Sequence, residues 1–206
     1  MLPVRERSVT AICGVPGSGK TFLALAVAKA ALRDGAKVKY FSAWEERDAI
    51  AKRFETMGIL GNPDVTHDFM DCLLRKGKFE LNMLFDGEND DFVVIDGIEY
   101  FLFKEGGIRE LAAKLNAYAS SRKGILITFS VPAREKSAPV ESVIDLGYLD
   151  AFKTTYAIDS PIDGSWNLRL RVVKDSYGIF RENGFSPAGR NARFIDLNVA
   201  GYMTAE

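Results

Sequence analysis

A glycine-rich run that ends in a lysine and a threonine lies near the start of the chain and carries its clearest chemistry. It fits the phosphate-binding pattern G-x-x-x-x-G-K-T, known as Walker A. Glycines let backbone N–H groups turn inward around an anion, and the positive end of a following helix adds to the attraction. The residues that we expect to hold a nucleotide here are Gly14, Val15, Pro16, Gly17, Ser18, Gly19, Lys20, Thr21 and Phe22.

Two side chains of this run have specific expected roles. Lys20 should reach the β and γ phosphates, and the Thr21 hydroxyl should ligate Mg²⁺. The context favours this, because an apolar run at residues 9–13 precedes the loop and strong helix formers at residues 21–32 follow it. A glycine-rich turn that binds nothing is the alternative interpretation.

Asp96 is a second expected site residue. It ends the apolar run at residues 92–96, in the pattern called Walker B. In a parallel sheet, a carboxylate at that end of a strand lies beside the phosphate loop, where it can hold Mg²⁺ through water. The competing interpretation is an ordinary aspartate that starts a turn with Gly97.

Three further polar residues follow expected strands. Glu45 and Glu46 come after the second strand, where a carboxylate can activate water against a γ-phosphate. They fit a helix start equally well, since Ser42 and Glu45 have the spacing of a capping box. Ser130 ends a later apolar strand, and it either senses the γ-phosphate or is a plain strand-end residue.

Length and composition describe an ordinary globular chain. Its 206 residues predict one domain, residues 1–206, with a substantial core. A net charge of −1 gives no overall field toward nucleic acid or membrane. Cys13 and Cys72 form no disulfide framework, and no run resembles a signal peptide or a membrane span. We therefore expect a cytoplasmic protein with no membrane partner.

Apolar runs and amphipathic stretches alternate along the first two thirds of the chain, which predicts an α/β fold with a mostly parallel sheet flanked by helices. Strands are expected at residues 9–13, 37–41, 92–96 and 124–130, and helices at 21–32, 44–57 and 108–121. Antiparallel hairpin strands should follow at 154–159, 166–173 and 193–197, with a turn at 161–164. Residues 61–90 predict only short helical pieces, and 101–107 a surface loop.

Taken together, these motifs resemble the RecA-like P-loop ATPases, in particular their KaiC-like branch. The resemblance extends from about residue 9 to residue 197. It implies the RecA-like topology and a single domain of this kind. Its most specific parts are residues 14–21, 40–46, 92–96 and 170–174.

The resemblance also implies roles for individual residues. In the family, a carboxylate at the position of Glu46 or Glu45 activates water. Members form rings or filaments with ATP at subunit interfaces, and a Lys-x-Arg from one subunit stabilises phosphate charge in the next. Lys174 matches that lysine, but Ser176 stands where the family has arginine, which implies slow hydrolysis in the absence of a competent partner.

The expected function is Mg²⁺-dependent ATP hydrolysis by a homo-oligomer, or by an assembly with paralogous subunits. Hydrolysis would drive assembly or conformational change, with single- or double-stranded DNA as a possible partner. One alternative is an ATP-binding regulator or recombination mediator that hydrolyses slowly or not at all. A second is a small-molecule or nucleotide kinase, although the only candidate for an arginine-rich lid is the thin segment 134–136.

Overall fold

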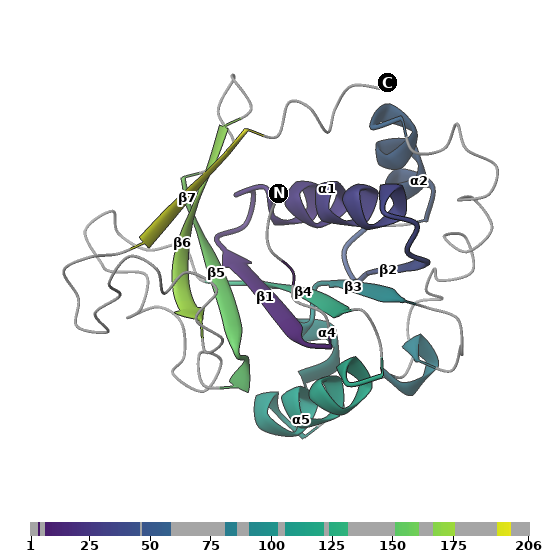
Figure 1. Cartoon of the computed structure of the whole chain (residues 1–206), viewed down its shortest axis with the longest axis vertical. Coiled ribbons are helices and arrows are strands. Elements are labelled where there is room, and N and C mark those ends of the chain that lie inside the picture. Colours follow the sequence, from purple (N-terminus) through teal and green to yellow (C-terminus); the bar gives the residue numbers. More distant parts are fainter. Residues whose placement is uncertain are drawn as a thin grey trace.

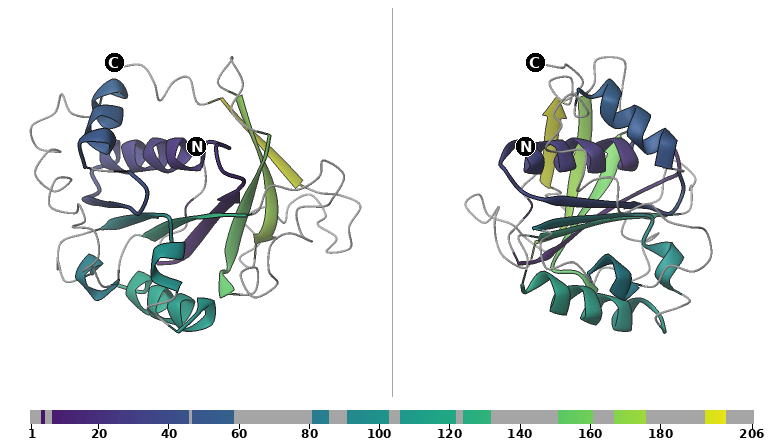
Figure 2. Two further views of the ribbon diagram at one scale, coloured as in Figure 1. Left: turned by 180° about the vertical axis from the view of Figure 1, so that it is seen from behind. Right: turned by 90° about the vertical axis from the view of Figure 1, so that its right-hand side faces the viewer.

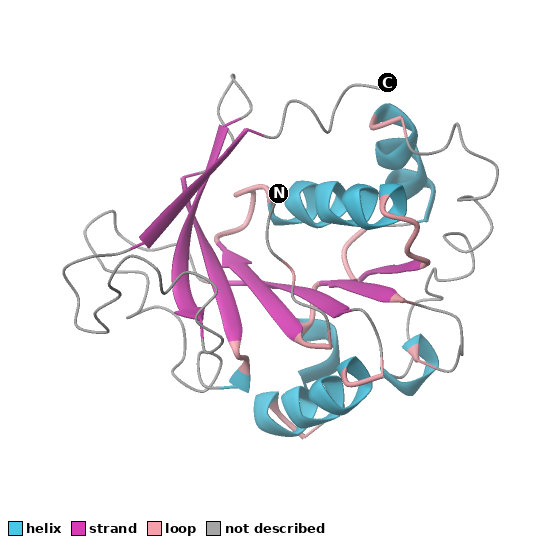
Figure 3. Cartoon of the chain, viewed as in Figure 1, coloured by secondary structure: helices cyan, strands magenta, loops and turns pink. Residues whose placement is uncertain are grey.

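A seven-stranded sheet forms the centre of the part of the chain that the computed structural model describes (Figure 1). The described residues are 4, 7–45, 47–58, 81–85, 91–102, 106–121, 124–131, 151–160, 167–175 and 193–198. Helices lie on both sides of the sheet and strands between them (Figure 3).

The elements follow the predicted order. The strands are β1 (Val9–Gly14), β2 (Val38–Ser42), β3 (Phe92–Asp96), β4 (Gly124–Ser130), β5 (Thr154–Ser160), β6 (Asn167–Asp175) and β7 (Arg193–Asn198). The helices are α1 (Lys20–Arg33), α2 (Arg47–Thr56), α4 (Glu99–Leu102) and α5 (Ile108–Ala119), with a 3-10 turn, η1, at Leu81–Leu84.

The strand order is β2-β3-β4-β1-β5-β6-β7. β1 pairs in parallel with β4 and β5, and β3 pairs in parallel with β2 and β4. β6 is antiparallel to both β5 and β7. The predicted α/β class, with a mostly parallel sheet and antiparallel strands toward the C-terminus, is confirmed. Because β4 separates β1 from β3, the strand that precedes the phosphate loop is not a direct neighbour of the strand that ends in Asp96.

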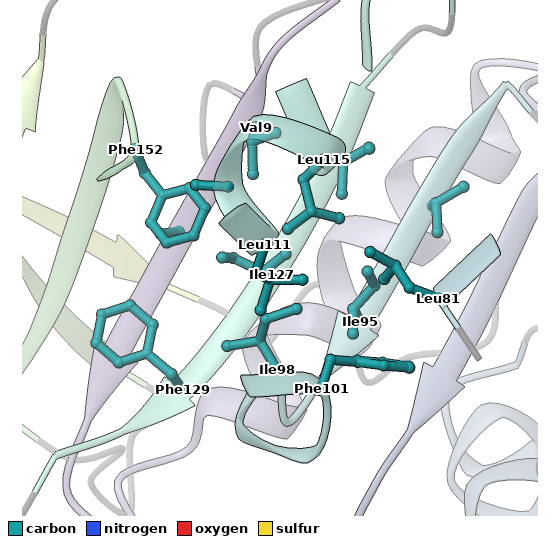
Figure 4. Packing of buried hydrophobic residues seen from close by; sticks show 14 of the residues in the cluster. Val9, Leu81, Ile95, Ile98, Phe101, Leu111, Leu115, Ile127, Phe129 and Phe152 are labelled. Atoms are coloured by element: carbon teal, nitrogen blue, oxygen red, sulfur yellow. The ribbon is translucent and has the colours of Figure 1, made fainter. Parts of the chain in front are cut away.

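Successive residues of the parallel strands point to opposite faces of the sheet, as the pleat requires. On β3, for example, Val94 packs with α1 and α2, while Val93 and Ile95 pack in the second cluster with α4, α5 and η1. The two groups of helices cover opposite faces of the sheet (Figure 2). In the second cluster, side chains of β1, β3 and β4 pack against Leu111 and Leu115 of α5 (Figure 4).

Two local expectations differ from the structure. The helix expected at 44–57 begins only at Arg47, because the Ser42 hydroxyl accepts the backbone N–H groups of Trp44 and Glu45 and holds a bend there. The segment after β3 is not simply a surface loop: it starts with α4, where Phe101 is fully buried and contacts Phe41. The buried ring of Phe101 anchors the start of this segment in the core.

Several other expectations concern segments that lie wholly or partly outside the described residues. η1 falls within the stretch expected to hold short helical pieces, most of which lies outside the described residues. The expected turn at 161–164 and Cys72 also lie outside them. Cys13 is a fully buried core residue, and burial raises the pKa of its thiol to about 12. Among the described residues, no helix is long and apolar enough to cross a membrane.

Candidate functional site

The phosphate loop connects β1 to α1 at the edge of the sheet where the parallel strands end (Figure 1). Gly17 and Gly19 have φ angles of 77° and 97°, in the left-handed region that favours glycine. A Cβ on Gly14 would lie 2.5 Å from the Ser18 hydroxyl oxygen and 3.3 Å from the Ile158 Cβ, so a side chain here would force its neighbours to move. The loop residues Val15, Pro16 and Gly17 are exposed, and Ser18 is buried.

The first turn of α1 is suited to an anion. Gly19 occupies its N-cap position, no side chain caps it, and its first turn contains no acidic residue. The positive end of the helix is therefore not neutralised from within the helix. The buried Ser18 hydroxyl next to it has no hydrogen-bond partner among the described residues. Phe22, in the first turn of α1, is partly buried and packs against the core on the α1 side of the sheet.

Lys20 lies folded over the loop that it would serve. Its Nζ donates hydrogen bonds to the carbonyl oxygens of Gly14 and Val15, at 3.1 and 2.9 Å. Only 9% of the residue is exposed. Burial lowers the pKa of Lys20, and the negative charges of Glu99 and Asp96 oppose this shift. The amine is thus a cation held at the loop, close to two carboxylates.

Asp96 is buried at the end of β3, on the face of the sheet that carries α1. Its carboxylate accepts hydrogen bonds from the hydroxyls of Thr128 (2.5 Å), Tyr40 (3.2 Å) and Thr21. Burial raises the pKa of Asp96; these three hydrogen bonds counteract part of that rise, and the charge of Glu45 adds to it. The predicted Walker A threonine and Walker B aspartate are therefore in direct contact.

This contact offers the oxygen ligands that a hard cation prefers. Mg²⁺ in nucleotide sites is held by one or two side-chain oxygens, while phosphates and water complete its octahedron. The Thr21 hydroxyl and the Asp96 carboxylate fit that arrangement. The part of the chain that the structure describes contains no cluster of three or more His, Cys, Asp or Glu that would hold a metal by itself. A cation here would thus depend on phosphate oxygens.

Glu45 takes part in a second set of contacts beyond the end of β2. Its backbone N–H donates to the Ser42 hydroxyl at 3.0 Å, which is one half of the predicted capping box. Its carboxylate forms a two-pronged ion pair with Arg53 of α2, at 2.7 and 2.9 Å. Both carboxylate oxygens of Glu45 therefore already have a cationic partner. Glu46 lies outside the described residues.

Glu99 is a carboxylate that the sequence interpretation missed. It begins α4, and its Oε1 accepts a hydrogen bond from the backbone N–H of Ser130. Ser130 is paired in register with Gly14, so this contact reaches the base of the phosphate loop. The spacing of an aspartate and a glutamate three residues apart, Asp96 and Glu99, was the signal available in the sequence.

Lys174 lies away from these groups. It is near the end of β6 and is paired with Thr155, which is in turn paired with Ala11 of β1. It therefore sits level with the middle of β1 and not with Gly14, where β1 ends. The described structure brings together Lys20, Thr21, Asp96 and Ser130, and leaves Lys174 outside that group. Ser176 lies outside the described residues.

Comparison with known protein families gives one match. The family described as "IstB-like ATP binding protein" matches residues 4–52, which include β1, the phosphate loop, α1 and β2. The search among curated proteins gave no match.

Solved structures give broader matches. The flagellar accessory protein FlaH from Methanocaldococcus jannaschii superposes with a TM-score of 0.62 at 16% identity, covering 84% of this chain and 80% of that one. A DnaB-like replicative helicase matches with a TM-score of 0.66 at 13% identity, covering 97% of this chain but only 57% of the helicase. The RadB recombinase matches with a TM-score of 0.60 at 18% identity, covering 84% of each chain. The chain thus has the fold of the RecA-like P-loop ATPases.

Proposed function

We propose that this chain binds ATP together with Mg²⁺ at the phosphate loop and hydrolyses the γ-phosphate. The observation that carries the proposal is the contact between the Thr21 hydroxyl and the buried Asp96 carboxylate, beside the lysine of an uncapped helix start. A buried carboxylate with a raised pKa is costly without a cation, so its place next to a phosphate loop favours a metal–phosphate ligand. The match to an ATP-binding family over residues 4–52 supports the same ligand.

Each residue of the site has a proposed task. Bound Mg²⁺ would neutralise charge on the β and γ phosphates. Thr21 would ligate it directly and Asp96 would hold it through water. Lys20 would leave the carbonyls of its own loop and donate to phosphate oxygens, while the backbone N–H groups of residues 14–22 surround the phosphate chain. Ser130, beside Gly14, would sense the γ-phosphate.

We further propose that the chain is a single domain of the KaiC-like branch that works in an assembly, with itself or with paralogous subunits. Lys174 would then act in a neighbour's site. Its position level with Ala11, away from its own loop, supports a role between subunits. Work on single- or double-stranded DNA fits two of the structural relatives, the replicative helicase and the RadB recombinase, and we propose it as the process served. Cysteine usage favours the cytoplasm.

Phosphate release by the purified chain tests the hydrolysis. We expect steady-state release from ATP that requires Mg²⁺ and falls at least about tenfold in Asp96→Asn, because the metal loses a partner. Asp91→Asn is the matched control, since Asp91 precedes the opposite end of the same strand, β3, and should leave the rate unchanged. Equal rates in the two variants would contradict the assignment of Asp96.

The non-hydrolysing regulator remains the second candidate, and the sequence Lys174-Asp175-Ser176 favours it because the family arginine is absent. It predicts tight MgATP binding with no release above background at any protein concentration. Restoration of release by Ser176→Arg would assign the slow rate to the missing arginine and favour the ATPase. A variant that still binds without release would favour the regulator.

A further inference from the structure

The carboxylate of Glu99 lies over the end of β4, between the two halves of the phosphate site. β4 is the strand that separates β1 from β3: its Ser130 is paired with Gly14 of the loop, and its Thr128 with Asp96. Because Glu99 Oε1 accepts the N–H of Ser130, the carboxylate is fixed between the loop and Asp96. This is where the end of a triphosphate chain held by the loop would meet the metal held by Asp96.

The route of the chain after β3 accounts for this position. Gly97 has a φ of 99°, and a Cβ there would clash with the Trp44 indole and with Ala43. The N–H of Gly97 donates to the Thr128 hydroxyl at 3.0 Å, and the N–H of Ile98 donates to the Thr128 carbonyl at 2.9 Å. The turn is thus tied to β4, and α4 begins with its first side chain over the end of that strand.

One oxygen of Glu99 is left with nothing to bind. Oε2 is buried and meets no hydrogen-bond partner from another residue in the described ranges. A buried acceptor without a donor is uncommon in folded proteins, and it marks a place where a water or a ligand belongs. Burial raises the pKa of Glu99, and the N–H of Ser130 and the charge of Lys20 oppose the shift. Such a carboxyl is better able to take up a proton at neutral pH than an exposed one.

Glu45 is in the opposite situation. Both of its oxygens are bound by Arg53, and it follows β2, the edge strand of the sheet. A water would have to compete with the guanidinium of Arg53 for both of these oxygens. Glu99 has a free oxygen, a position over β4 and an electrostatic interaction with Lys20.

We infer that Glu99 is the general base of the proposed hydrolysis, with Oε2 receiving the proton of the attacking water. This inference rests on the proposed function. The water oxygen forms a bond to the γ-phosphorus while the bond from that phosphorus to the β–γ bridging oxygen breaks. ADP leaves with the bridging oxygen, the water proton passes to Glu99, and Glu99 then returns it to the departing phosphate or to solvent. Atoms and charge balance without a further reactant.

Glu99→Gln tests the inference, because glutamine keeps an oxygen for the N–H of Ser130 but cannot take a proton. We expect the rate of phosphate release to fall at least about 100-fold, within the range for loss of a general base. Binding of MgATP should persist. The ratio of the ADP to the ATP dissociation constant should rise about fivefold, since a negative charge facing the γ-phosphate is removed. The matched control is Glu110→Gln, an exposed glutamate in the first turn of α5, which should behave as the wild type.

The outcomes separate the inference from the function on which it rests. A wild-type chain that does not bind MgATP overturns the proposed function and the inference with it. Binding without any release overturns the assignment of Glu99 as a base, while the ADP-to-ATP ratio in Glu99→Gln still reports whether its charge faces the γ-phosphate. Release by Glu99→Gln at the wild-type rate overturns the inference alone. Loss of release in Glu45→Gln with retention in Glu99→Gln assigns the base to Glu45.

Discussion

Two aspartates in different halves of the same sheet, one in the parallel half and one in the antiparallel half, have opposite surroundings. Asp96 ends β3 in the parallel half, is 1% exposed, and accepts hydrogen bonds only from uncharged hydroxyls among the partners that the structure describes. Asp196 lies on β7 in the antiparallel ribbon, is exposed, and pairs with Arg169 of β6 at 2.7 Å. Burial raises the pKa of Asp96, whereas the hydrogen bond from Arg169 lowers that of Asp196.

The buried carboxylate of Asp96 is the one that the proposed nucleotide site would use, whereas the surface carboxylate of Asp196 is already paired within the fold. The folded chain supplies Asp96 with hydroxyls and places the cation Lys20 nearby without a direct bond between the two. Asp196 already has a counter-ion in Arg169 and is screened by water, so its charge contributes little to stability and needs no ligand. We call the end of the parallel strands that carries Lys20 and Asp96 the parallel edge, and the antiparallel strands β6 and β7 the ribbon. Mutations at the parallel edge should therefore change nucleotide affinity and stability strongly, and mutations in the ribbon only weakly.

The largest expected effect is at the lysine of the parallel edge. Lys20→Ala should weaken ATP binding about 100-fold, since hydrogen bonds from a charged donor to phosphate are lost. Equilibrium titration with a fluorescent ATP analogue measures it. Lys37→Ala, which changes an exposed lysine just before β2, is the control and should bind as the wild type. Equal affinity of the two variants would remove the parallel edge from nucleotide binding.

Asp96→Asn should have opposite effects on ligand binding and on stability. Affinity for MgATP should fall about tenfold, and most of the gain that Mg²⁺ gives over metal-free ATP should disappear. The midpoint of thermal unfolding of the nucleotide-free protein should rise by a few degrees, on the order of 2–4 °C for each 1 kcal/mol in a domain of this size. A lower midpoint in the variant would show that the charged carboxylate stabilises the fold by itself.

The pH dependence of stability should differ between the two aspartates. The raised pKa of Asp96 means that the folded state keeps this proton to a higher pH than the unfolded state. Its contribution to stability is then complete below the ordinary aspartate pKa of about 3.9 and is lost as pH rises through the folded-state pKa. Denaturant titrations across this window should show the stability gain of Asp96→Asn growing with pH. A gain that is constant across the window would contradict the raised pKa.

An intermediate case is the pair between Glu45 and Arg53, which is partly exposed at 22% and 51%. Removing it with Arg53→Gln should cost about 0.2–1 kcal/mol of unfolding free energy, typical of such pairs. A double-mutant cycle with Glu45→Gln measures the coupling between the two side chains. A much larger coupling would contradict the expectation that this partly exposed ion pair contributes little to stability.

The smallest effect is expected in the antiparallel ribbon. Asp196→Asn should leave the denaturation midpoint and nucleotide affinity unchanged within error, because its side chain is 67% exposed and its charge is screened by solvent. A double-mutant cycle with Arg169→Gln should show a smaller coupling than the cycle for Glu45 and Arg53. A clear loss of ATP affinity in either variant would mean that the ribbon takes part in the site.

The sequence was enough to predict the strands, because each apolar run fits the pleat. The runs at 92–96 and 124–130 coincide with β3 and β4, and the phosphate loop joins β1 to α1 as expected. The proximity of Thr21 and Asp96 followed from the rule that parallel strands end at one edge. The hydroxyls of Tyr40 and Thr128 bind Asp96 because side chains alternate between the two faces of the sheet, and all three lie on the face that carries α1.

What the sequence did not reveal depends on tertiary contacts. The order of strands places β4 between β1 and β3, and only that order brings Glu99 over Ser130. Phe101 was expected in a surface loop, yet the core between α5 and the sheet accepts its ring. The pairing of Glu45 with Arg53 requires the bend at Ser42, which no periodicity predicts.

Direct titration of the wild-type chain with ATP, with Mg²⁺ and then with excess chelator, tests the central claim most simply. We expect one saturable site in a calorimeter, with a Kd for MgATP within about 1 µM to 1 mM, the usual span of enzyme KM values. Binding should be weaker once the metal is removed, and about 100-fold weaker in Lys20→Ala. An absence of saturable heat with MgATP, or an affinity indifferent both to the metal and to Lys20, would contradict the account.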